Sequence, residues 1–432
     1  MEPDGSWPVV WDRARGLHVW DAQGRKYLDL TAAFGVAAAG HANPRVVRAG
    51  QKQMARLLHA MGDVHPHALK AQLARELSRI TFEQWAESQP EGRRPQAKRT
   101  KESANRGTGK TIFCNSGFEA VEAALKTAML ATGKPGVIAF EGAYHGLGYG
   151  ALNATHRLHF RAPFRPQLRE FARFVRFPKQ EPPSSSALPM EGIDAQIRRL
   201  LQQEEIGAIL VEPVQARGGI NIPPPDFLPL LRRLCDSHGA LLVVDEIYTG
   251  FGRTGKWFAC EHWGVEPDVI CLGKALTGGF PLSACVGRAG IMDAAWPVST
   301  GEAIHTSTFL GHPVGCAMAL AQIQEIKDGN LVQRSADLGH LLLASLRALA
   351  SNASSLVLAA RGLGLLAGLE LRSRDGSPAT AEALGAIKTL LRRGFILLPE
   401  GEYSNVISFT PLLTISENQL RTAVKVLGEA LT

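Results

Sequence analysis

The sequence LLVVDEIYTGFGRTG at residues 241–255, together with PDVICLGKALTGGFP at residues 267–281, decides the fold and the candidate site. Each segment contains an apolar run of the length of a buried strand, LLVVD in the first and VICLG in the second. The first run ends at Asp245 and the second is followed by Lys274. Ligand-binding residues of a parallel sheet gather at the carboxyl ends of its strands, so we expect this carboxylate and this amine to lie together.

A carboxylate and a lysine at paired strand ends are what pyridoxal phosphate (PLP) chemistry requires. The lysine amine can form a Schiff base with the cofactor aldehyde, and a buried carboxylate keeps the pyridine nitrogen protonated so that the ring accepts electrons. A lone lysine at a strand end is more often an ordinary surface residue. The surroundings of Lys274 are apolar and glycine-rich, however, which predicts a lowered pKa and a neutral amine that attacks and moves protons. We therefore predict Lys274 and Asp245 as catalytic residues.

Short apolar strands alternate with helical segments from Thr111 onward. This pattern predicts an α/β fold with a mostly parallel sheet that is covered by helices on both faces. We expect a large domain at residues 63–318, with a basic insertion at about 84–110. Residues 1–62 and 319–432 are expected to form a smaller α+β domain from the two ends of the chain, since 432 residues exceed one ordinary core.

The two ends of the chain give local predictions of their own. Alternating residues around a turn at residues 22–24 predict a hairpin, and amphipathic helices are expected at 44–61 and 67–80. Near the other end, helices are expected at 312–330 and around 335–350. Further apolar segments then suggest the strands of the small domain.

The net charge of +7 does not indicate a nucleic-acid-binding protein, because the basic residues are unevenly placed. Residues 91–110 contain seven lysines and arginines against two glutamates, in a Pro/Gly/Ser-containing stretch that we interpret as a solvated loop. This loop ends in ANRGTGKT at residues 104–111, which resembles a phosphate-binding loop. We reject that interpretation, because such a loop follows a buried strand and opens a helix, whereas this one leads into a strand.

Six scattered cysteines without CxxC spacing indicate neither a disulfide framework nor a metal site. No apolar run reaches the roughly 18 residues that a membrane span needs, and the N-terminus lacks the pattern of a leader. We expect a cytoplasmic protein that binds neither metal, membrane nor nucleic acid.

Three further strand ends carry candidate site residues. Ser116 and Gly117 begin a helix directly after a strand. Simple helix capping is the commoner reason for Ser-Gly, but together with Lys274 and Asp245 this position favours phosphate binding. Tyr144 and His145 follow another strand, where a ring could stack on a flat cofactor or merely pack. Glu212 ends the strand AILVEP, and a carboxylate there needs a partner or caps a loop.

Several longer segments together make the family recognisable. They are FCNSGFEAVEAALKTA (113–128), FEGAYHG (140–146), EPVQARGG (212–219), DEIYTGFGRTG (245–255), LGKALTGGFPLSA (272–284) and HTSTFLGHP (305–313). With LDLTAAFGVAAAGHANP (28–44) and ARGLGLLAGLEL (360–371), they cover nearly the whole chain. The sequence resembles the class III (ornithine/4-aminobutyrate type) aminotransferases of PLP fold type I.

The resemblance implies a role for individual residues. Lys274 would carry the cofactor, Asp245 would pair with its pyridine nitrogen, and Tyr144 would stack on its ring. Thr308 would reach the phosphate of the neighbouring subunit, so the resemblance also implies a homodimer. The full set of expected PLP-binding residues is Ser116, Gly117, Phe118, Tyr144, His145, Glu212, Asp245, Ile247, Tyr248, Lys274 and Thr308.

Three positions depart from the family pattern and bear on substrate. Ser408 stands where many members carry an arginine that clamps a carboxylate. Arg217 stands where several members carry a glutamate, so it either receives a carboxylate or faces solvent. Tyr248 replaces a glutamine near the phenolic oxygen of the cofactor, where its hydroxyl could still donate a hydrogen bond. Donors without a carboxylate and donors bound through Arg217 or the N-terminal segment both remain open.

The expected reaction is transfer of an amino group from an amine or amino-acid donor, possibly an ω-amine, to a keto acid. A ping-pong mechanism through Lys274 follows from the covalent chemistry. Two alternatives remain: an aminomutase of the glutamate-semialdehyde type, which would retain its intermediate, and a relative without catalytic activity that serves as a scaffold.

Overall fold

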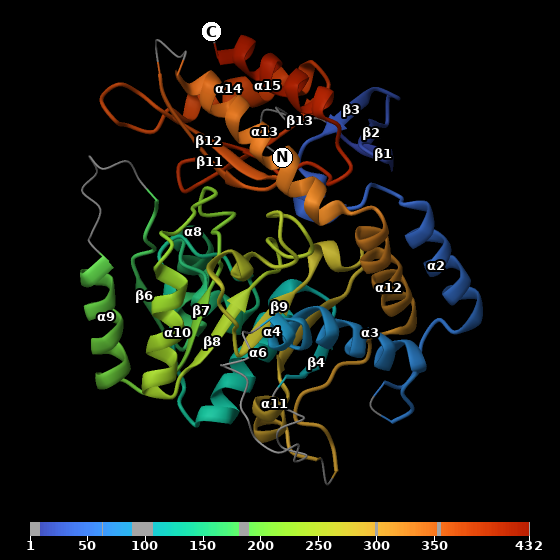
Figure 1. Ribbon diagram of the computed structural model, residues 1–432, viewed down its shortest axis with the longest axis vertical. Helices are drawn as coiled ribbons and strands as arrows, with labels where there is room; N and C mark the ends of the chain where they lie inside the picture. The colour runs from blue at the N-terminus through green and yellow to red at the C-terminus, as the bar shows by residue number, and fades with distance from the viewer. Residues whose placement is uncertain are drawn as a thin grey trace.

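The computed structural model describes residues 9–62, 64–88, 107–180, 190–298, 301–351 and 356–431. A large sheet with helices around it forms the lower part of the molecule in Figure 1, and two smaller sheets with helices α14 and α15 lie above it. The N-terminal strands, drawn in blue, lie beside elements from the C-terminal end of the chain.

The central sheet has seven strands in the order β4-β10-β9-β8-β7-β5-β6. All run in the same direction except β10, which is antiparallel to both of its neighbours. The predicted mostly parallel sheet is therefore confirmed. Its strands are β4 (Gly109–Cys114), β5 (Gly136–Phe140), β6 (Ala172–Val175), β7 (Ile206–Val211), β8 (Leu241–Asp245), β9 (Val269–Leu272) and β10 (Ser283–Arg288).

Strand residues alternate between two apolar cores, one on each face of the sheet. In β8, Leu242 and Val244 belong to the larger core, while Val243 belongs to the smaller core with the alanines of α6 (Gly117–Thr132). The small alanine side chains let α6 lie close to the strands. Because both faces are covered, the strands read as continuous apolar runs.

Helices cover the sheet and join it to the smaller sheets (Figure 1). Helices α2 and α12 lie side by side, and Gly50 permits their approach, since a Cβ there would lie 2.9 Å from Sδ of Met318. The helices are α1 (Ala32–Gly35), α2 (Pro44–Arg56), α3 (Ala68–Ser78), α4 (Gln84–Ser88), α6 (Gly117–Thr132), α7 (Tyr149–Ala154), α8 (Leu158–Arg161), α9 (Met190–Gln203), α10 (Phe227–His238), α11 (Ala289–Ala295), α12 (Pro313–Asp328), α13 (Leu331–Ser351), α14 (Thr380–Arg392) and α15 (Glu417–Leu431).

Two four-stranded sheets complete the molecule. The first has the order β1-β2-β3-β13 and joins the N-terminal strands to the C-terminal half, because β13 runs parallel to β3. The second, β11-β12-β15-β14, is antiparallel. The strands are β1 (Trp11–Arg15), β2 (His18–Asp21), β3 (Lys26–Asp29), β11 (Val357–Leu363), β12 (Leu366–Arg372), β13 (Phe395–Ile396), β14 (Leu398–Glu400) and β15 (Val406–Phe409).

The predicted hairpin is confirmed as β2 and β3 on either side of the turn at residues 22–24. Helix α2 ends at Arg56, earlier than predicted, and α3 continues through a π-helical turn, Arg79–Glu83. The predicted boundary at 318/319 falls inside α12, and the division into domains stays a prediction. Most of the basic insertion, residues 89–106, lies outside the described residues, but β4 begins at Gly109 as the rejection of a phosphate loop requires.

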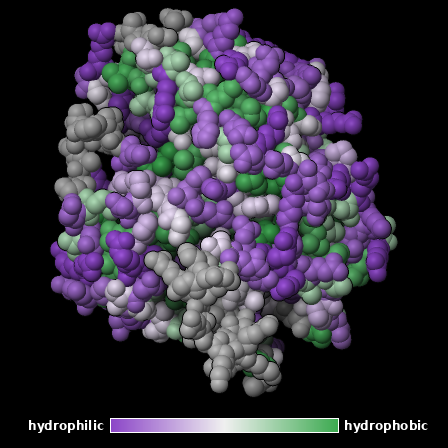
Figure 2. All heavy atoms as spheres, viewed as in Figure 1, coloured by the Kyte–Doolittle hydropathy of each residue, from purple (hydrophilic) through white to green (hydrophobic). Residues whose placement is uncertain are grey.

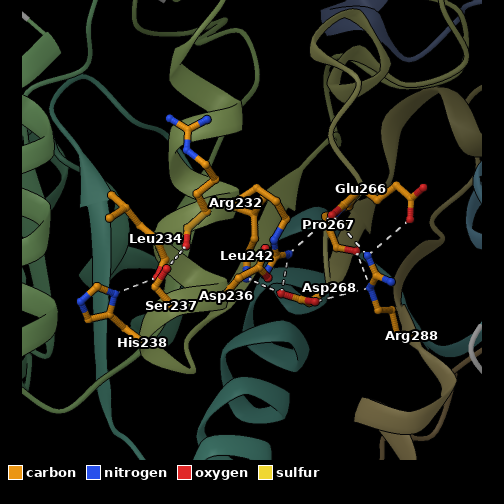
Figure 3. Close-up of polar contacts among 11 residues, drawn as sticks. Arg232, Leu234, Asp236, Ser237, His238, Leu242, Glu266, Pro267, Asp268 and Arg288 are labelled. Carbon is orange, nitrogen blue, oxygen red and sulfur yellow. Dashed lines mark hydrogen bonds and ion pairs between the residues drawn. The ribbon is translucent and has the colours of Figure 1, made fainter. Parts of the chain in front are cut away.

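A charged cluster lies at the amino ends of β8 and β9, at the other end of these strands from Asp245 and Lys274 (Figure 3). The carboxylate of Asp268 accepts hydrogen bonds from Nη1 of Arg232 at 2.7 Å and from the backbone amide of Leu242 at 2.8 Å. Nε of Arg288 lies 3.4 Å from its other oxygen. This carboxylate therefore joins a helix and three strands at the edge away from Lys274.

One face of the surface is mostly hydrophilic, and the cysteines lie inside the protein. Hydrophilic residues cover most of the face in Figure 2, with apolar residues between them. Within the described residues, no helix is both long enough and apolar enough to cross a bilayer. All six cysteines are buried and unpaired.

Candidate active site

A cavity of about 390 Å3 lies at the carboxyl ends of the central strands. Both predicted catalytic residues, Lys274 and Asp245, line it. Nine other predicted residues are near them, eight lining the cavity and Ser116 next to its lining. The lining residues are Gly117, Phe118, Tyr144, His145, Gly146, Leu147, Glu212, Arg217, Asp245, Ile247, Tyr248, Thr249 and Lys274.

The carboxylate of Asp245 is buried and held at both oxygens. Oδ2 lies 2.8 Å from Nδ1 of His145, and Oδ1 accepts a hydrogen bond of 3.0 Å from the amide of Ile247. His145 is itself buried, and its Nε2 has no hydrogen-bond partner among the described residues. His145 thus orients the carboxylate that a pyridine nitrogen would meet.

Lys274 directly follows β9 and Gly273 and begins a short 3-10 turn. Its Nζ lies 4.6 Å from the centre of the Tyr248 ring. Protein encloses the amine except on the cavity side, and this burial lowers the pKa of Lys274, while the charges of Asp245 and Glu212 oppose the shift. The neutral amine is therefore more populated than in an ordinary lysine, and only the neutral amine is a nucleophile.

The first turn of α6 fits a phosphate group. Ser116 is its N-cap, and the Oγ atom of Ser116 is buried without a hydrogen-bond partner among the described residues. The first amides of a helix lack intrahelical acceptors and attract anions. Gly117 permits the close packing of this turn, since a Cβ would lie 3.0 Å from the Cδ1 atom of Ile247.

Glu212 connects the loops that carry Tyr144 and Arg217. It accepts hydrogen bonds from the amides of Tyr144 at 2.9 Å and Ala216 at 3.3 Å. Burial raises the pKa of Glu212 to about 7. Ile247, two residues after Asp245, also lines the cavity, so aromatic and aliphatic groups are available for the faces of a flat ring.

Arg217 lines the cavity instead of facing bulk solvent, with its guanidinium carbon 5.6 Å from the centre of the Tyr144 ring. Its Nε lies 3.5 Å from Oε2 of Glu400, the last residue of β14. Nη2 of Arg157 donates a hydrogen bond to the backbone oxygen of Arg217. Sequence reasoning missed Arg157 and Glu400. Glu400 ends an apolar strand, which is the same signal that identified Glu212.

Two other predicted positions, Ser408 and Thr308, lie outside the cavity lining, whereas Tyr248 lines it. Ser408 is buried in β15, opposite Gly368 and Leu398, and is not part of the cavity lining. Thr308 is exposed and lies outside the lining. The hydroxyl of Tyr248 is 3.3 Å from the Oγ1 atom of Thr410, so it already has a hydrogen-bond partner within the protein.

The N-terminal segment contributes a further contact that sequence reasoning missed. Ala32, Ala33 and Phe34 have positive φ angles of 46°, 49° and 61°, and α1 packs on the turn that begins at Lys274. A Cβ on Gly35 would lie 3.3 Å from the Tyr248 ring. The sequence gives no sign of this contact, because it depends on positive φ angles, which are uncommon at residues other than glycine.

Comparison with known proteins agrees with this geometry. The family described as Aminotransferase class-III matches residues 2–431. Acetylornithine aminotransferase of Methanosarcina mazei is 35% identical, over 100% of this chain and 93% of that protein. Putrescine aminotransferase of Pectobacterium atrosepticum is 36% identical, over 98% and 82%. The solved structure of Toxoplasma gondii ornithine aminotransferase, described with PLP at its active site, has a TM-score of 0.80 at 27% identity and covers 98% and 90%.

Proposed function

The chain belongs to the class III aminotransferases, which are PLP-dependent transaminases, and we propose that it moves the amino group of a carboxylate-bearing ω-amine to a keto acid. The observation that carries the substrate class is Arg217, which lines the cavity beside Tyr144. The names of the relatives do not decide this point, because acetylornithine has a carboxylate and putrescine has none.

The residues present fit PLP. Bound PLP supplies an aldehyde that captures amines and a ring that accepts electrons. Ser116, Gly117 and Phe118 would hold the phosphate at the start of α6, and Asp245, held by His145, would meet the pyridine nitrogen. Tyr144, Glu212, Ile247 and Tyr248 would surround the ring.

Lys274 performs the proton transfers in this proposal. Its lowered pKa increases the fraction of neutral amine, so Lys274 would be the residue that holds the cofactor and that accepts and returns the proton of the substrate carbon. The nearby charges of Asp245 and Glu212 stabilise Lys274 when it carries that proton. Because the oxo product of the donor would leave before the keto acid binds to the same site, we expect ping-pong kinetics.

A homodimer is part of the proposal. Thr308 lies outside the cavity of its own chain, in an exposed stretch with Ile304 at 75% and Phe309 at 56% exposure. Two exposed apolar side chains in one short stretch are compatible with a protein interface there. A second copy covering this stretch would bring its Thr308 toward the phosphate end of the site. A cytoplasmic location also remains part of the proposal and is tested by cell fractionation.

The test is the visible absorbance of the holoenzyme after addition of 5-aminopentanoate or pentylamine, which differ only by the carboxylate. We expect the cofactor band to shift with 5-aminopentanoate at lower concentration. A shift with pentylamine alone would contradict the proposed substrate class. No shift with any amine, and no oxo product released into solution, would favour the aminomutase instead.

A further inference from the structure

Glu400 is a buried carboxylate that lies behind the cavity wall. It is 3% exposed and is not among the lining residues, whereas its partner Arg217 is. It is the last residue of β14 and pairs with Val406 of β15, so its backbone is fixed. The carboxylate is therefore buried on a backbone position that the small sheet fixes.

The charges around Glu400 are mostly positive. Arg217, Arg157 and Lys274 all stabilise its ionised form. Besides burial, the negative charge of Glu400 contributes to the raised pKa of Tyr248. Strand β15, which packs on β14, carries no titratable side chain. Helix α14 also packs on β14, and its titratable side chains are exposed or half-buried: Glu382, Lys388 and Arg392.

The pair of Glu400 and Arg217 is incomplete. Their nearest nitrogen and oxygen are 3.5 Å apart, and Nε of Arg217 and Oε2 of Glu400 both lack a hydrogen-bond partner among the described residues. The loop cannot easily close this distance, because the backbone oxygen of Arg217 accepts hydrogen bonds from Arg157 and from the amide of Gly401 at 3.2 Å. The guanidinium of Arg217 thus faces Glu400 on one side and lines the cavity on the other, so a substrate carboxylate can reach the same guanidinium from the cavity side.

We propose that Glu400 takes up one proton from solvent when a substrate carboxylate binds to Arg217. This inference rests on the proposed function and deepens it, because it makes recognition of the carboxylate a proton-coupled step. The substrate carboxylate would approach the exposed side of Arg217 while Glu400 stays behind the guanidinium.

The physical reason is that two carboxylates on one guanidinium repel each other. The substrate carboxylate keeps access to water in the cavity, but Glu400 does not, so Glu400 is the group that becomes neutral. Burial already raises the pKa of Glu400 to about 7, against the opposing charges of Arg217, Arg157 and Lys274. Little further repulsion is needed to keep the proton there at neutral pH.

The sign of the pH dependence follows. Well below its raised pKa of about 7, Glu400 is mostly protonated in the free enzyme, so the affinity for the carboxylate should change little with pH. Above pH 7 the proton must be taken up on binding, so the dissociation constant increases roughly tenfold per pH unit until the pKa of the bound state is reached. A neutral ligand of the same shape has no such dependence.

The experiment is titration calorimetry of the holoenzyme at pH 8 with pentanoate and with pentanamide, each in two buffers of different ionisation enthalpy. We expect pentanoate to take up more than half a proton per site and pentanamide none. The substitution Glu400→Gln abolishes the uptake, while Glu402→Gln, at an exposed position two residues away, retains it. Uptake that persists in Glu400→Gln would overturn the inference.

A second measurement does not depend on a variant that folds. The dissociation constant of pentanoate for the unmodified holoenzyme should increase between pH 7 and pH 8.5, and that of pentanamide should not. Equal pH profiles, or no binding of pentanoate, would overturn the inference. The proposed transamination fails separately, if no amine donor shifts the cofactor absorbance.

Discussion

Lys274 combines an unfavourable backbone with a buried amine. Its φ of 38° lies in the left-handed region, which costs a residue with a Cβ roughly 1 kcal/mol. Gly273, just before it, packs closely on Ile247, with 3.3 Å between a Cβ there and the Cγ2 atom. The turn therefore places the amine in the cavity at the expense of local backbone energy.

Replacing this amine tests its role directly. Lys274→Ala should reduce turnover by at least about 1,000-fold, because both the nucleophile and the proton carrier are lost. Single-turnover loss of the cofactor band after donor addition measures the effect. Lys256→Ala, an exposed lysine of the loop that follows β8, is the matched control. Full turnover in Lys274→Ala would contradict the assignment.

Arg217 should separate donors by their carboxylate. Arg217→Gln removes a charge-assisted hydrogen bond, so KM for 5-aminopentanoate should increase roughly 30- to 100-fold. KM for pentylamine should change little. Arg421→Gln, at an exposed position on α15, provides the control. An equal increase for both amines would mean that Arg217 only supports the wall of the cavity.

Glu246 gives a pH-dependent stability. It is fully buried, accepts hydrogen bonds from the amides of Ala259 at 2.9 Å and Cys260 at 2.7 Å, and burial raises its pKa to about 7. A pKa raised from its usual 4.5 gives stability that is present below pH 4.5 and lost as pH rises through 7.

The variant Glu246→Gln does not lose this stability with pH. The difference in thermal midpoint between the wild type and Glu246→Gln should therefore shift in favour of the variant between pH 5 and pH 8. Differential scanning fluorimetry at a fixed scan rate measures both proteins, and Glu417→Gln at an exposed position corrects for the loss of one charge. A constant difference across this range would contradict the expectation.

At the scale of elements, the carboxyl ends of the central strands carry the candidate catalytic residues, whereas a charged cluster joins the amino ends of β8 and β9 (Figure 3). Asp268→Ala removes the buried carboxylate that accepts hydrogen bonds from Nη1 of Arg232 and from the amide of Leu242. The free energy of unfolding should decrease by roughly 3 kcal/mol, as for other broken buried pairs. Asp236→Ala removes an exposed partner of the same arginine and should cost below about 1 kcal/mol. Urea unfolding measures both, and equal losses would contradict this view.

The elements that the sequence predicted are those with a strong local signal. The strands that end at Asp245 and before Lys274 are continuous apolar runs, so their neighbourhood in one sheet could be inferred from them. Strand β6 and helix α15 have no such clear signal in the sequence and were not predicted. The pairing of Arg217 with Glu400 was also not predicted, because it depends on how two sheets pack and no local pattern encodes that distance.

At the scale of the whole molecule, the dimer can be tested by mixing subunits. Thr308→Ala should weaken cofactor binding, and Lys274→Ala should abolish turnover. In a mixed dimer with shared sites, one site carries both changes and the other carries neither, so activity with tight cofactor binding should return. Mixtures no better than the parents would show that Thr308 acts within its own chain, or in no site at all.

The parallel pairing of β3 with β13 has a consequence for synthesis on the ribosome. Leu28 donates its amide hydrogen to Gly394 at 2.8 Å, and Leu30 donates to Ile396 at 3.0 Å. At about 5–20 residues per second, these acceptors emerge tens of seconds after the N-terminal strands. The nascent chain therefore carries this sheet without its fourth strand during most of its translation, so the unpaired side of β3 is open to chaperones that hold unfolded chains.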